Sequence, residues 1–415
     1  MKKVYFKTFG CRTNLYDSQV MISALKEYEV TKNEDEADAI VINSCTVTNG
    51  ADSHVRTYIS HIEKTSNAKI FLTGCGAHTK GESLLSSGRV HGVFGQSEKL
   101  KIDSLLSAEN PYYNPGDLNH IDNAIVDDFV GKSRAFIKVQ EGCDFRCSYC
   151  IIPFVRGDAR SMNEDKILEQ ISRLALNGFG EFILTGTNVG SYGKGNNSSM
   201  AKLMKRISQI RGVRRIRLGS VEPIQITDEF KEILDEPWLE KHLHIALQHT
   251  SPKMLKIMNR RNVYKQDREL FEFLSDKGFA IGTDFITGHP GETQEIWNEA
   301  IENLNNLPLT HLHAFTYSKR DGTPSAIMKP EINGKIAKER LHEIEAIIEQ
   351  KNYDFRQKHN VNLEVLIESQ REEGLYQGFD QFFNKLLLKS DEDMLGNWID
   401  IEKYEIKKGN NYAEL

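Results

Sequence analysis

The stretch EGCDFRCSYC, residues 141–150, places three cysteines in the spacing C-x3-C-x2-C, at Cys143, Cys147 and Cys150 (hereafter the loop trio). It follows an apolar run at residues 135–139 that has the length of a strand. Helix-like and strand-like segments alternate after it, which predicts a β/α barrel. Barrel enzymes carry their chemistry on loops at the carboxyl ends of the strands. The stretch therefore predicts both the fold of the central region and the position of its site.

The other three cysteines, Cys11, Cys45 and Cys75 (the sheet trio), end the apolar runs VYFKTFGC, AIVINSC and KIFLTGC. The runs repeat at about the length of a βαβ unit. Helix-like stretches at residues 17–27 and 49–64 lie between them, which predicts a parallel sheet. Since the carboxyl ends of such strands share one edge, where open α/β sheets bind ligands, we expect the three thiols to meet in one site.

Two sets of three thiols predict two iron–sulfur clusters with chemistry at both. A cluster of four irons that only carries electrons normally has four protein ligands, so three ligands leave one iron open for a substrate. A structural zinc needs a fourth Cys or His ligand at a set spacing. After residue 150 the chain has no further cysteine, and its first histidine is His242. We therefore favour clusters over zinc.

Composition indicates a globular protein of several domains. The chain has 415 residues, 39% of them hydrophobic, and a mean hydropathy of −0.48. No apolar run approaches the roughly 18 residues of a membrane span, and the start MKKVYFKTFG predicts a strand and not a signal peptide. We expect a cytoplasmic location, where thiols stay reduced and grouped cysteines are more often ligands than disulfides.

We expect an α/β chain of three domains. Residues 1–110 form an N-terminal parallel α/β sheet domain with the sheet trio, and residues 111–132, which have Pro, Gly, Asn and Asp without periodicity, form a linker. Residues 133–359 form a partial (β/α)6 barrel, and residues 360–415 form a small β-barrel of short strands. The barrel strands are expected at residues 135–139, 181–184, 215–218, 243–247, 280–286 and 312–316, with a closing helix at 335–359.

The net charge of −6 does not mark a nucleic-acid binder, but its distribution is uneven. Residues 361–415 hold 12 Asp and Glu against 6 Lys and Arg, and the rest of the chain is balanced. Three groups of cations beside the predicted site loops indicate a local basic surface. They are Arg146, Arg156 and Arg160; Arg206, Arg211, Arg214, Arg215 and Arg217; and Lys256, Arg260, Arg261 and Lys265. The alternative is ordinary solvated faces.

The segment KVQEGCDFRCSYCIIPFVRGDARS, residues 138–161, resembles the methylthiotransferase family of radical S-adenosylmethionine (SAM) enzymes, including the aromatic Tyr149 before the last cysteine. Other segments resemble family motifs in order: TFGCRTN, NSCTVTN, TGCGA, LTGTNVGSYG, RLGSVEP, HIALQHTSPKMLKIMNR, GTDFITGHPGET and FTYSKRDGTPSA. The C-terminal barrel resembles the RNA-binding TRAM module that ends these enzymes. The resemblance spans the chain.

The resemblance implies two [4Fe-4S] clusters and two SAM molecules per turnover. The loop trio would hold the cluster whose open iron chelates SAM and whose electron generates a 5′-deoxyadenosyl radical. The sheet trio would hold an auxiliary cluster that carries the sulfur to be inserted, and the second SAM methylates that sulfur. The protein supplies orientation and exclusion of water.

Polar residues at other predicted strand ends are candidate SAM contacts by family analogy. They are Gly186, Thr187, Asn188, Ser220, Glu222 and Gln248, with Asp284 inside the fifth strand. Tyr149 would shield the cluster, touch the adenine of SAM or pack in the core. For each single residue the alternative is loop capping or a satisfied buried polar group. We assign no ligand role to the histidines around the later strands, His242, His244, His249, His311 and His313.

The family has three branches, which act on isopentenyladenosine in tRNA, on threonylcarbamoyladenosine in tRNA, or on a ribosomal-protein aspartate. Arg12, directly after Cys11, and the tail CIIPFVRGDARS resemble the threonylcarbamoyl branch. This implies 2-methylthiolation at C2 of N6-threonylcarbamoyladenosine next to the anticodon, with the other two targets as alternatives. The implied partners are the tRNA anticodon loop, an electron donor and a sulfur source. A non-catalytic metal-containing RNA-binding protein is the alternative from another class.

Overall fold

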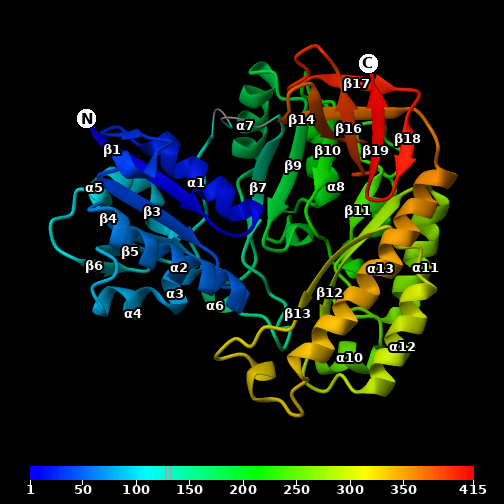
Figure 1. The fold of residues 1–415 in the computed structure, drawn as a ribbon, viewed down its shortest axis with the longest axis horizontal. Coiled ribbons are helices and arrows are strands. Elements are labelled where there is room, and N and C mark those ends of the chain that lie inside the picture. The colour runs from blue at the N-terminus through cyan, green and yellow to red at the C-terminus, as the bar shows by residue number, and fades with distance from the viewer. Residues whose placement is uncertain (127–128, 130–132, 196) are drawn as a thin grey trace.

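The computed structural model describes residues 1–126, 129, 133–195 and 197–415. Figure 1 shows an N-terminal α/β unit in blue beside a curved central sheet in green and yellow, with the red C-terminal strands against one end of that sheet. Within the described residues, no helix has both the length and the apolar character that crossing a membrane requires.

The N-terminal sheet has six parallel strands in the order β2-β1-β3-β4-β5-β6. Its strands are β1 (Lys2–Thr8), β2 (Tyr28–Val30), β3 (Ala39–Ser44), β4 (Lys69–Gly74), β5 (Gly92–Phe94) and β6 (Tyr112–Asn114). The three apolar runs of the sequence are the adjacent central strands β1, β3 and β4. Because helices cover both faces, β3 is buried at every position. The strand order reverses between β1 and β3, which is where open α/β sheets bind ligands.

Strand β6 is an addition to the predicted sheet. Strand β6 lies in the segment 111–132, which the sequence predicts to be a linker, and it pairs with β5. Three residues are too few to show an alternating pattern, and the neighbouring Pro, Asn and Asp residues conceal the strand in the sequence. Residues 127–128 and 130–132 of this segment lie outside the described residues.

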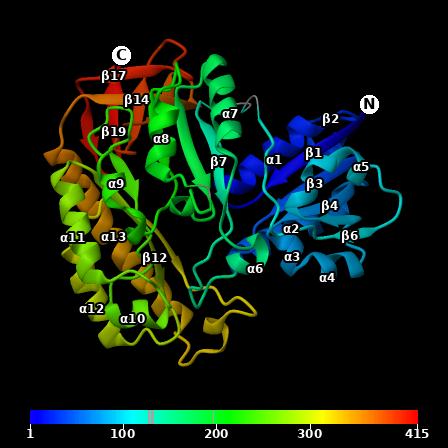
Figure 2. The same cartoon turned by 180° about the vertical axis from the view of Figure 1, so that it is seen from behind.

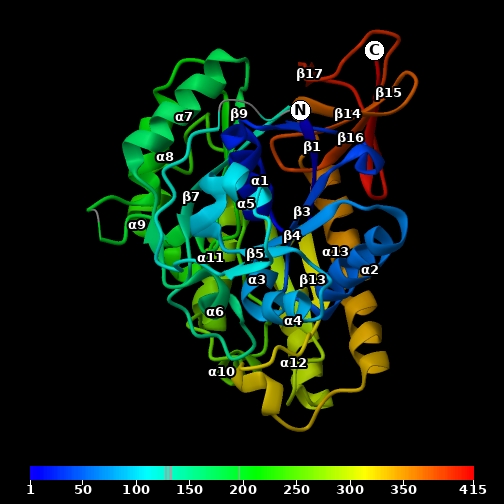
Figure 3. The same cartoon turned by 90° about the vertical axis from the view of Figure 1, so that its left-hand side faces the viewer.

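Helices cover the N-terminal sheet on both faces (Figure 1). One face is packed by α2 (Asn49–Thr65), α3 (Gly76–Thr79) and α4 (Gly81–Ser86), and the other by α1 (Arg12–Ala24) and α5 (Ile102–Leu106). Helix α1 serves two cores. Its Met21 packs in the N-terminal sheet, whereas Tyr16 and Val20 belong to the core of the central region. The N-terminal unit is therefore built into the side of the barrel (Figure 3).

The central region is a partial barrel of six parallel strands, as the sequence predicts. They are β7 (Ala135–Glu141), β9 (Glu181–Gly186), β10 (Arg215–Leu218), β11 (His242–His244), β12 (Ala280–Thr287) and β13 (His311–Thr316), with the short antiparallel β8 (Arg160–Ser161) beside β7. The pairing runs β7-β9-β10 and β11-β12-β13, and isolated bridges join β10 to β11. The helices are α6 (Ile152–Arg156), α7 (Glu164–Leu176), α8 (Met200–Ser208), α9 (Asp228–Lys231), α10 (Pro252–Ile257), α11 (Tyr264–Asp276), α12 (Gln294–Asn305) and α13 (Gly334–Lys358).

The C-terminal strands form a curled sheet, a half-barrel, in the order β17-β14-β15-β16-β19-β18. They are β14 (Leu363–Glu372), β15 (Leu375–Phe379), β16 (Lys385–Lys389), β17 (Trp398–Ile401), β18 (Glu405–Lys407) and β19 (Asn410–Glu414). All pairs are antiparallel except β16 with β19. The half-barrel packs on the amino ends of the barrel strands, where Arg217 donates to the Asp380 carbonyl oxygen at 2.7 Å (Figure 2). The carboxyl ends therefore stay available for a site.

Candidate functional site

The loop trio lies at the carboxyl end of β7, as expected from its position in the sequence. Gly142 begins the loop with a φ of +74°, and a Cβ there would clash with the carbonyl oxygen of Asp158. This tight turn is closed by the Cys143 N–H, which donates to the Gly157 carbonyl oxygen at 3.0 Å. The Cys143 sulfur accepts from the Phe145 N–H at 3.4 Å. Glycine is therefore required where the strand turns into the loop.

An arginine that the sequence does not single out for the site lies against the second cysteine. Arg260 Nη1 is 3.6 Å from the Cys147 sulfur and donates to Glu222 Oε1 at 2.9 Å. Arg260 Nη2 also bonds Glu222 and donates to the Ala246 carbonyl oxygen at 2.5 Å. Burial raises the pKa of Glu222 against the opposing effect of Arg260. Glu222, a predicted SAM contact, is thus fixed beside Cys147.

The candidates that follow β9 lie next to the loop trio. Asn188 Nδ2 donates to the Cys143 sulfur at 3.5 Å, and its Oδ1 accepts from Gln225 Nε2 at 2.8 Å. Thr187 Oγ1 accepts from the Gly142 N–H at 3.2 Å. Gly186 is paired with Gln140 at the end of the β7–β9 ladder. These three residues therefore line the turn that carries the cysteines.

The remaining candidates are placed differently. Ser220 is exposed at the end of β10. Gln248 adopts a φ of +68°, and its backbone bonds Asp284 and Ile286, so it holds a strained conformation of the kind found at functional sites. The Tyr149 ring packs edge-on against the His289 ring at 6.2 Å and against a methionine-rich cluster. The Tyr149 ring therefore packs toward the core.

The sheet trio is assembled from the ends of three neighbouring strands. Cys45 and Cys75 are buried and Cys11 is exposed. Gly10 has a φ of +98°, and a Cβ there would lie 2.5 Å from Cys45 Cβ, so only glycine lets the two turns approach. The Cys75 N–H donates to the Ser44 carbonyl oxygen at 3.0 Å. Burial raises the pKa of Cys45 to about 12, and a thiol in such a place ionises only with a metal or cation beside it.

One side chain reaches from the segment after the loop trio to the sheet trio. Arg156 follows the loop trio at the end of α6, and its Nε donates to the Cys75 sulfur at 3.2 Å. Cys75 also packs against Ile151 and Val155 of the same segment. Residues that follow one cysteine set therefore form part of the wall around the other, although about 70 residues of sequence separate the sets.

Arg156 belongs to a buried ionic network between the N-terminal unit and the barrel. It contacts Asp17 at 2.9 Å and Glu141 at 2.5 Å. Lys138 contacts Asp17 at 2.6 Å. All the side chains of the network are almost completely buried; the members are Asp17, Lys99, Asp122, Lys138, Glu141 and Arg156. Because an unpaired buried charge is costly, the network fixes the N-terminal unit on β7.

A second arginine of the barrel holds the sheet trio from the other side. Arg320, after β13, donates from Nη1 to the Thr46 carbonyl oxygen at 2.8 Å and contacts Asp52 at 2.7 Å. Its Nη2 bonds Asn49. Thr46 directly follows Cys45, so the loop that carries this cysteine is anchored to the barrel and not only to its own sheet.

The thiols of both trios have N–H donors beside them. A four-iron cluster takes thiolate ligands of this kind. N–H groups point at the sulfurs of Cys143, Cys147 and Cys75, an arrangement that stabilises thiolate charge.

The structure corrects the prediction of a basic surface at several positions. Arg156 and Arg260 are engaged as described above, and Arg215 and Arg217 are buried in ion pairs at the half-barrel interface. Arg217 contacts Glu181 at 2.6 Å. The sequence shows the cations but not the acids that the fold brings to them, so buried pairs resemble a surface cluster. Exposed cations such as Arg146, Arg206 and Arg214 still fit the predicted basic surface.

Known families and relatives match most of the chain. A model described as uncharacterized protein family UPF0004 matches residues 3–95, and the radical SAM superfamily model matches residues 137–304. A putative methylthiotransferase of Helicobacter pylori (strain J99) is 53% identical, with 100% of both chains covered. The threonylcarbamoyladenosine tRNA methylthiotransferase MtaB of Bacillus subtilis is 32% identical, with 100% of this chain and 96% of that protein covered.

Two further matches bear on the substrate and the fold. The tRNA-2-methylthio-N(6)-dimethylallyladenosine synthase of Wolinella succinogenes is 32% identical, with 95% of both chains covered. Among solved structures, the radical SAM methyltransferase TsrM from Kitasatospora setae aligns with a TM-score of 0.60 at 16% identity, covering 79% of this chain and 75% of that one. At that identity the match concerns the fold alone.

Proposed function

The chain belongs to the radical SAM methylthiotransferase family, and on that premise we propose that it transfers a methylthio group to C2 of N6-threonylcarbamoyladenosine in tRNA. The observation that carries the proposal is the contact of the segment after the loop trio with the sheet trio, in which Arg156 donates to Cys75 and Ile151 and Val155 pack against Cys75. Sulfur insertion needs a radical source and a sulfur source beside the same substrate atom. A single electron-transfer cluster needs no such arrangement.

The family implies a [4Fe-4S] cluster and SAM, and we assign them to the loop trio. We assign a second [4Fe-4S] cluster to the sheet trio. When bound, these groups supply the radical that removes hydrogen from adenine C2 and the sulfur that replaces it, and a second SAM supplies the methyl group. The protein orients them. Asn188 and Arg260 direct N–H groups at Cys143 and Cys147, and Glu222 holds Arg260 in place.

For the SAM pocket we retain the residues that the sequence predicts. Thr187, Asn188 and Glu222 lie beside the loop trio, and the backbone strain at Gln248 is consistent with a ligand contact. Gly186 is the last residue of β9 and Ser220 follows β10, so both stay candidates by their position at strand ends. In the sequence, Tyr149 lies between Cys147 and Cys150. This position alone keeps it as a candidate, because its ring packs toward the core.

Arg12 favours the threonylcarbamoyl substrate. Its guanidinium lies 5.9 Å from the centre of the Phe136 ring, and it forms no ion pair with any residue that the structure describes. Burial and the nearby Arg134 lower the pKa of Arg12. Glu240 and Glu368 oppose this shift from a distance, and a half-buried cation with no carboxylate at ion-pair distance can bind an anion. The threonyl group carries a carboxylate, whereas an isopentenyl group carries no charge.

The proposed partners are the tRNA anticodon loop, an electron donor and a sulfur source, with the reaction in the cytoplasm. A loop base can be splayed out of its stack, which makes its C2 edge reachable. The exposed Arg146, Arg206 and Arg214 would attract the phosphate backbone. The C-terminal half-barrel is acidic overall and would contact RNA only through local lysines.

The test is a reaction with protein reconstituted without oxygen, using dithionite, SAM, sulfide and tRNA that carries either threonylcarbamoyladenosine or isopentenyladenosine. We expect 5′-deoxyadenosine and 2-methylthio-N6-threonylcarbamoyladenosine, detected by mass spectrometry of nucleosides. Product only from isopentenyladenosine tRNA would refute the substrate. No 5′-deoxyadenosine, with zinc in metal analysis, would support a non-catalytic RNA-binding protein instead.

A further inference from the structure

Three side chains inside the barrel form a group that the roles above do not use. Asp284 of β12 is buried, and its Oδ1 lies 3.1 Å from His313 Nδ1 while its Oδ2 lies 3.3 Å from His244 Nε2. The sequence gives the histidines no role and names Asp284 only as a SAM-pocket candidate. The structure instead joins them as a carboxylate between two imidazoles.

His313 faces the inside of the barrel and remains accessible. Strand residues alternate between faces, and Leu312 and Ala314 pack into the core toward the outer helices. His313 therefore points to the opposite, inner face, where its ring is 5.3 Å from the Phe315 ring. Its side chain is 74% exposed, in contrast to Asp284 at 12%. Nδ1 is thus held by Asp284, and among the residues that the structure describes no hydrogen-bond partner contacts Nε2.

The group lies beside the segment that leads to the loop trio. The Val221 N–H donates to the His244 carbonyl oxygen at 3.0 Å, and Glu222, the next residue, holds Arg260 at Cys147. The Gln248 N–H donates to the Asp284 carbonyl oxygen at 2.9 Å. A substrate bound beside Glu222 and Gln248 would therefore lie near the free Nε2 edge of His313.

We propose that His313, oriented by Asp284, donates a hydrogen bond from Nε2 to a ring nitrogen of the purine base that is modified. The proposal rests on the proposed function for the identity of the base. In adenine the reacting C2 lies between N1 and N3, and both nitrogens accept hydrogen bonds. A donor held at one of them fixes the C2 edge toward the reacting groups.

The contact with Asp284 favours the protonated form of His313, which suits a donor role. The hydrogen bond with Asp284 raises the pKa of His313, against the effects of burial and of Arg12. In turn, although burial opposes it, His244 and His313 hold the pKa of Asp284 below its usual range. An imidazolium has N–H groups on both nitrogens, so it can donate to Asp284 and to the base at once.

The test is a double-mutant cycle on RNA binding. Anticodon stem-loops with adenosine, 1-deazaadenosine or 3-deazaadenosine at the target position are titrated against the wild type and against His313→Gln, with Kd read from fluorescence anisotropy. For the wild type we expect one deaza analogue to bind about tenfold more weakly, because it lacks the accepted nitrogen. For His313→Gln we expect that ratio to fall to about one. Asp284→Asn should give a ratio between the two.

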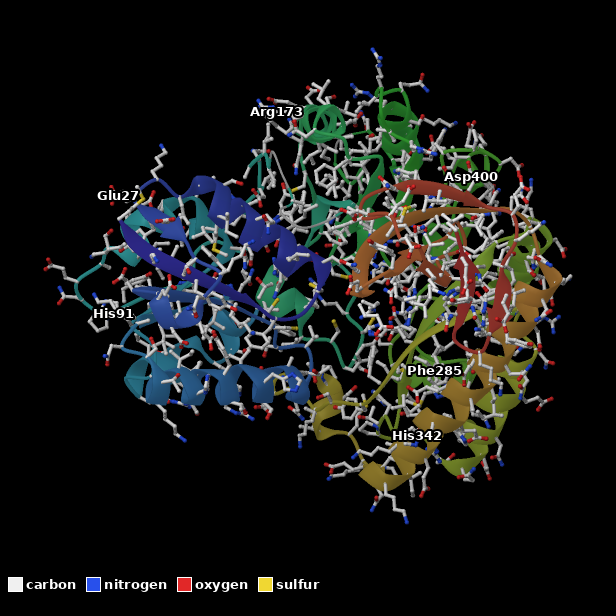
Figure 4. The ribbon with its side chains drawn as sticks, turned by 45° about the horizontal axis from the view of Figure 1, so that its top comes forward. Glu27, His91, Arg173, Phe285, His342 and Asp400 are labelled. Carbon is white, nitrogen blue, oxygen red and sulfur yellow. The ribbon has the colours of Figure 1, made fainter. Side chains whose placement is uncertain are left out.

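His342→Gln is the matched control, because His342 lies on the outer helix α13 whereas Phe285, the neighbour of Asp284, lies inside the molecule (Figure 4). This control should keep the wild-type ratio. The proposal is overturned if both analogues bind the wild type as well as adenosine does, or if His313→Gln keeps the ratio. If His313→Gln unfolds, His313→Asn is judged by the same ratios. The proposed function is tested separately on threonylcarbamoylated tRNA, and absence of methylthio product from that tRNA would refute it without deciding this binding result.

Discussion

The two cysteine sets are assembled by different routes. The loop trio lies within eight residues of one loop, so its local order is determined by the chain itself and by the turn at Gly142. The sheet trio spans 65 residues and meets only because β1, β3 and β4 are adjacent and in register. It further depends on Arg156 and Arg320, which belong to the barrel. We therefore expect mutations to disrupt the sheet trio more easily than the loop trio.

The largest expected effects come from removing one thiol of each set. Cys147→Ser should abolish both formation of 5′-deoxyadenosine and thiolation. Cys45→Ser should abolish thiolation but leave 5′-deoxyadenosine formation, because the loop trio is intact. Iron analysis should show about half of the wild-type iron in each variant. Unchanged thiolation in Cys45→Ser would remove the sheet trio from the reaction.

The next largest effect should come from breaking the ionic network between the N-terminal unit and the barrel. Arg156→Gln leaves the buried carboxylates of Asp17, Asp122 and Glu141 with one buried cation fewer to balance them, so we expect the free energy of unfolding to fall by about 3–5 kcal/mol. Urea unfolding of the cluster-free protein measures it. Arg268→Gln is the control, because its pair with Glu272 is exposed and should contribute less than about 1 kcal/mol. Equal effects of the two variants would show that the network does not hold the units together.

A smaller change should disturb the sheet trio alone. Gly10→Ala places a methyl group against Cys45 and strains a φ of +98°, at a cost of about 1–3 kcal/mol. We expect iron at the sheet trio to decrease while SAM cleavage persists. Gly88→Ala is the control, because Gly88 has a similar left-handed backbone, with a φ of +69°, but a Cβ there would meet no atom. The control therefore shows the effect of backbone strain without a clash. If both variants retain full iron, the close approach at Gly10 is not required.

The smallest effect should come from the opposite end of the barrel and leave both trios unchanged. Burial raises the pKa of Asp380 to about 6, above the ordinary value of 3.8, although the Phe382 and Asn384 N–H groups oppose it. The folded form therefore binds this proton more tightly than the unfolded form, and the stability it contributes is lost as pH rises through 4 to 6. Asp380→Asn should flatten that part of the pH dependence of the thermal midpoint. An unchanged slope would contradict the shift.

Several features could be predicted from the sequence because they depend on local patterns. The six barrel strands, the long helix α13 and the three apolar strands before the sheet trio follow from hydrophobic runs and their spacing. Strand β6 could not be predicted, because its three residues carry no pattern. The burial of Arg156, Arg217 and Arg260 could not be predicted either, since each depends on acids that are distant in sequence.

By itself, the sequence determined the family and the two groups of three thiols, because short-range spacing and motif order are written in the chain. Only the tertiary structure decided that Cys75 lies against Arg156 and that Asp284 joins His244 and His313. The physical reason is that a buried charge is stable only beside its partner, and folding alone brings such partners together.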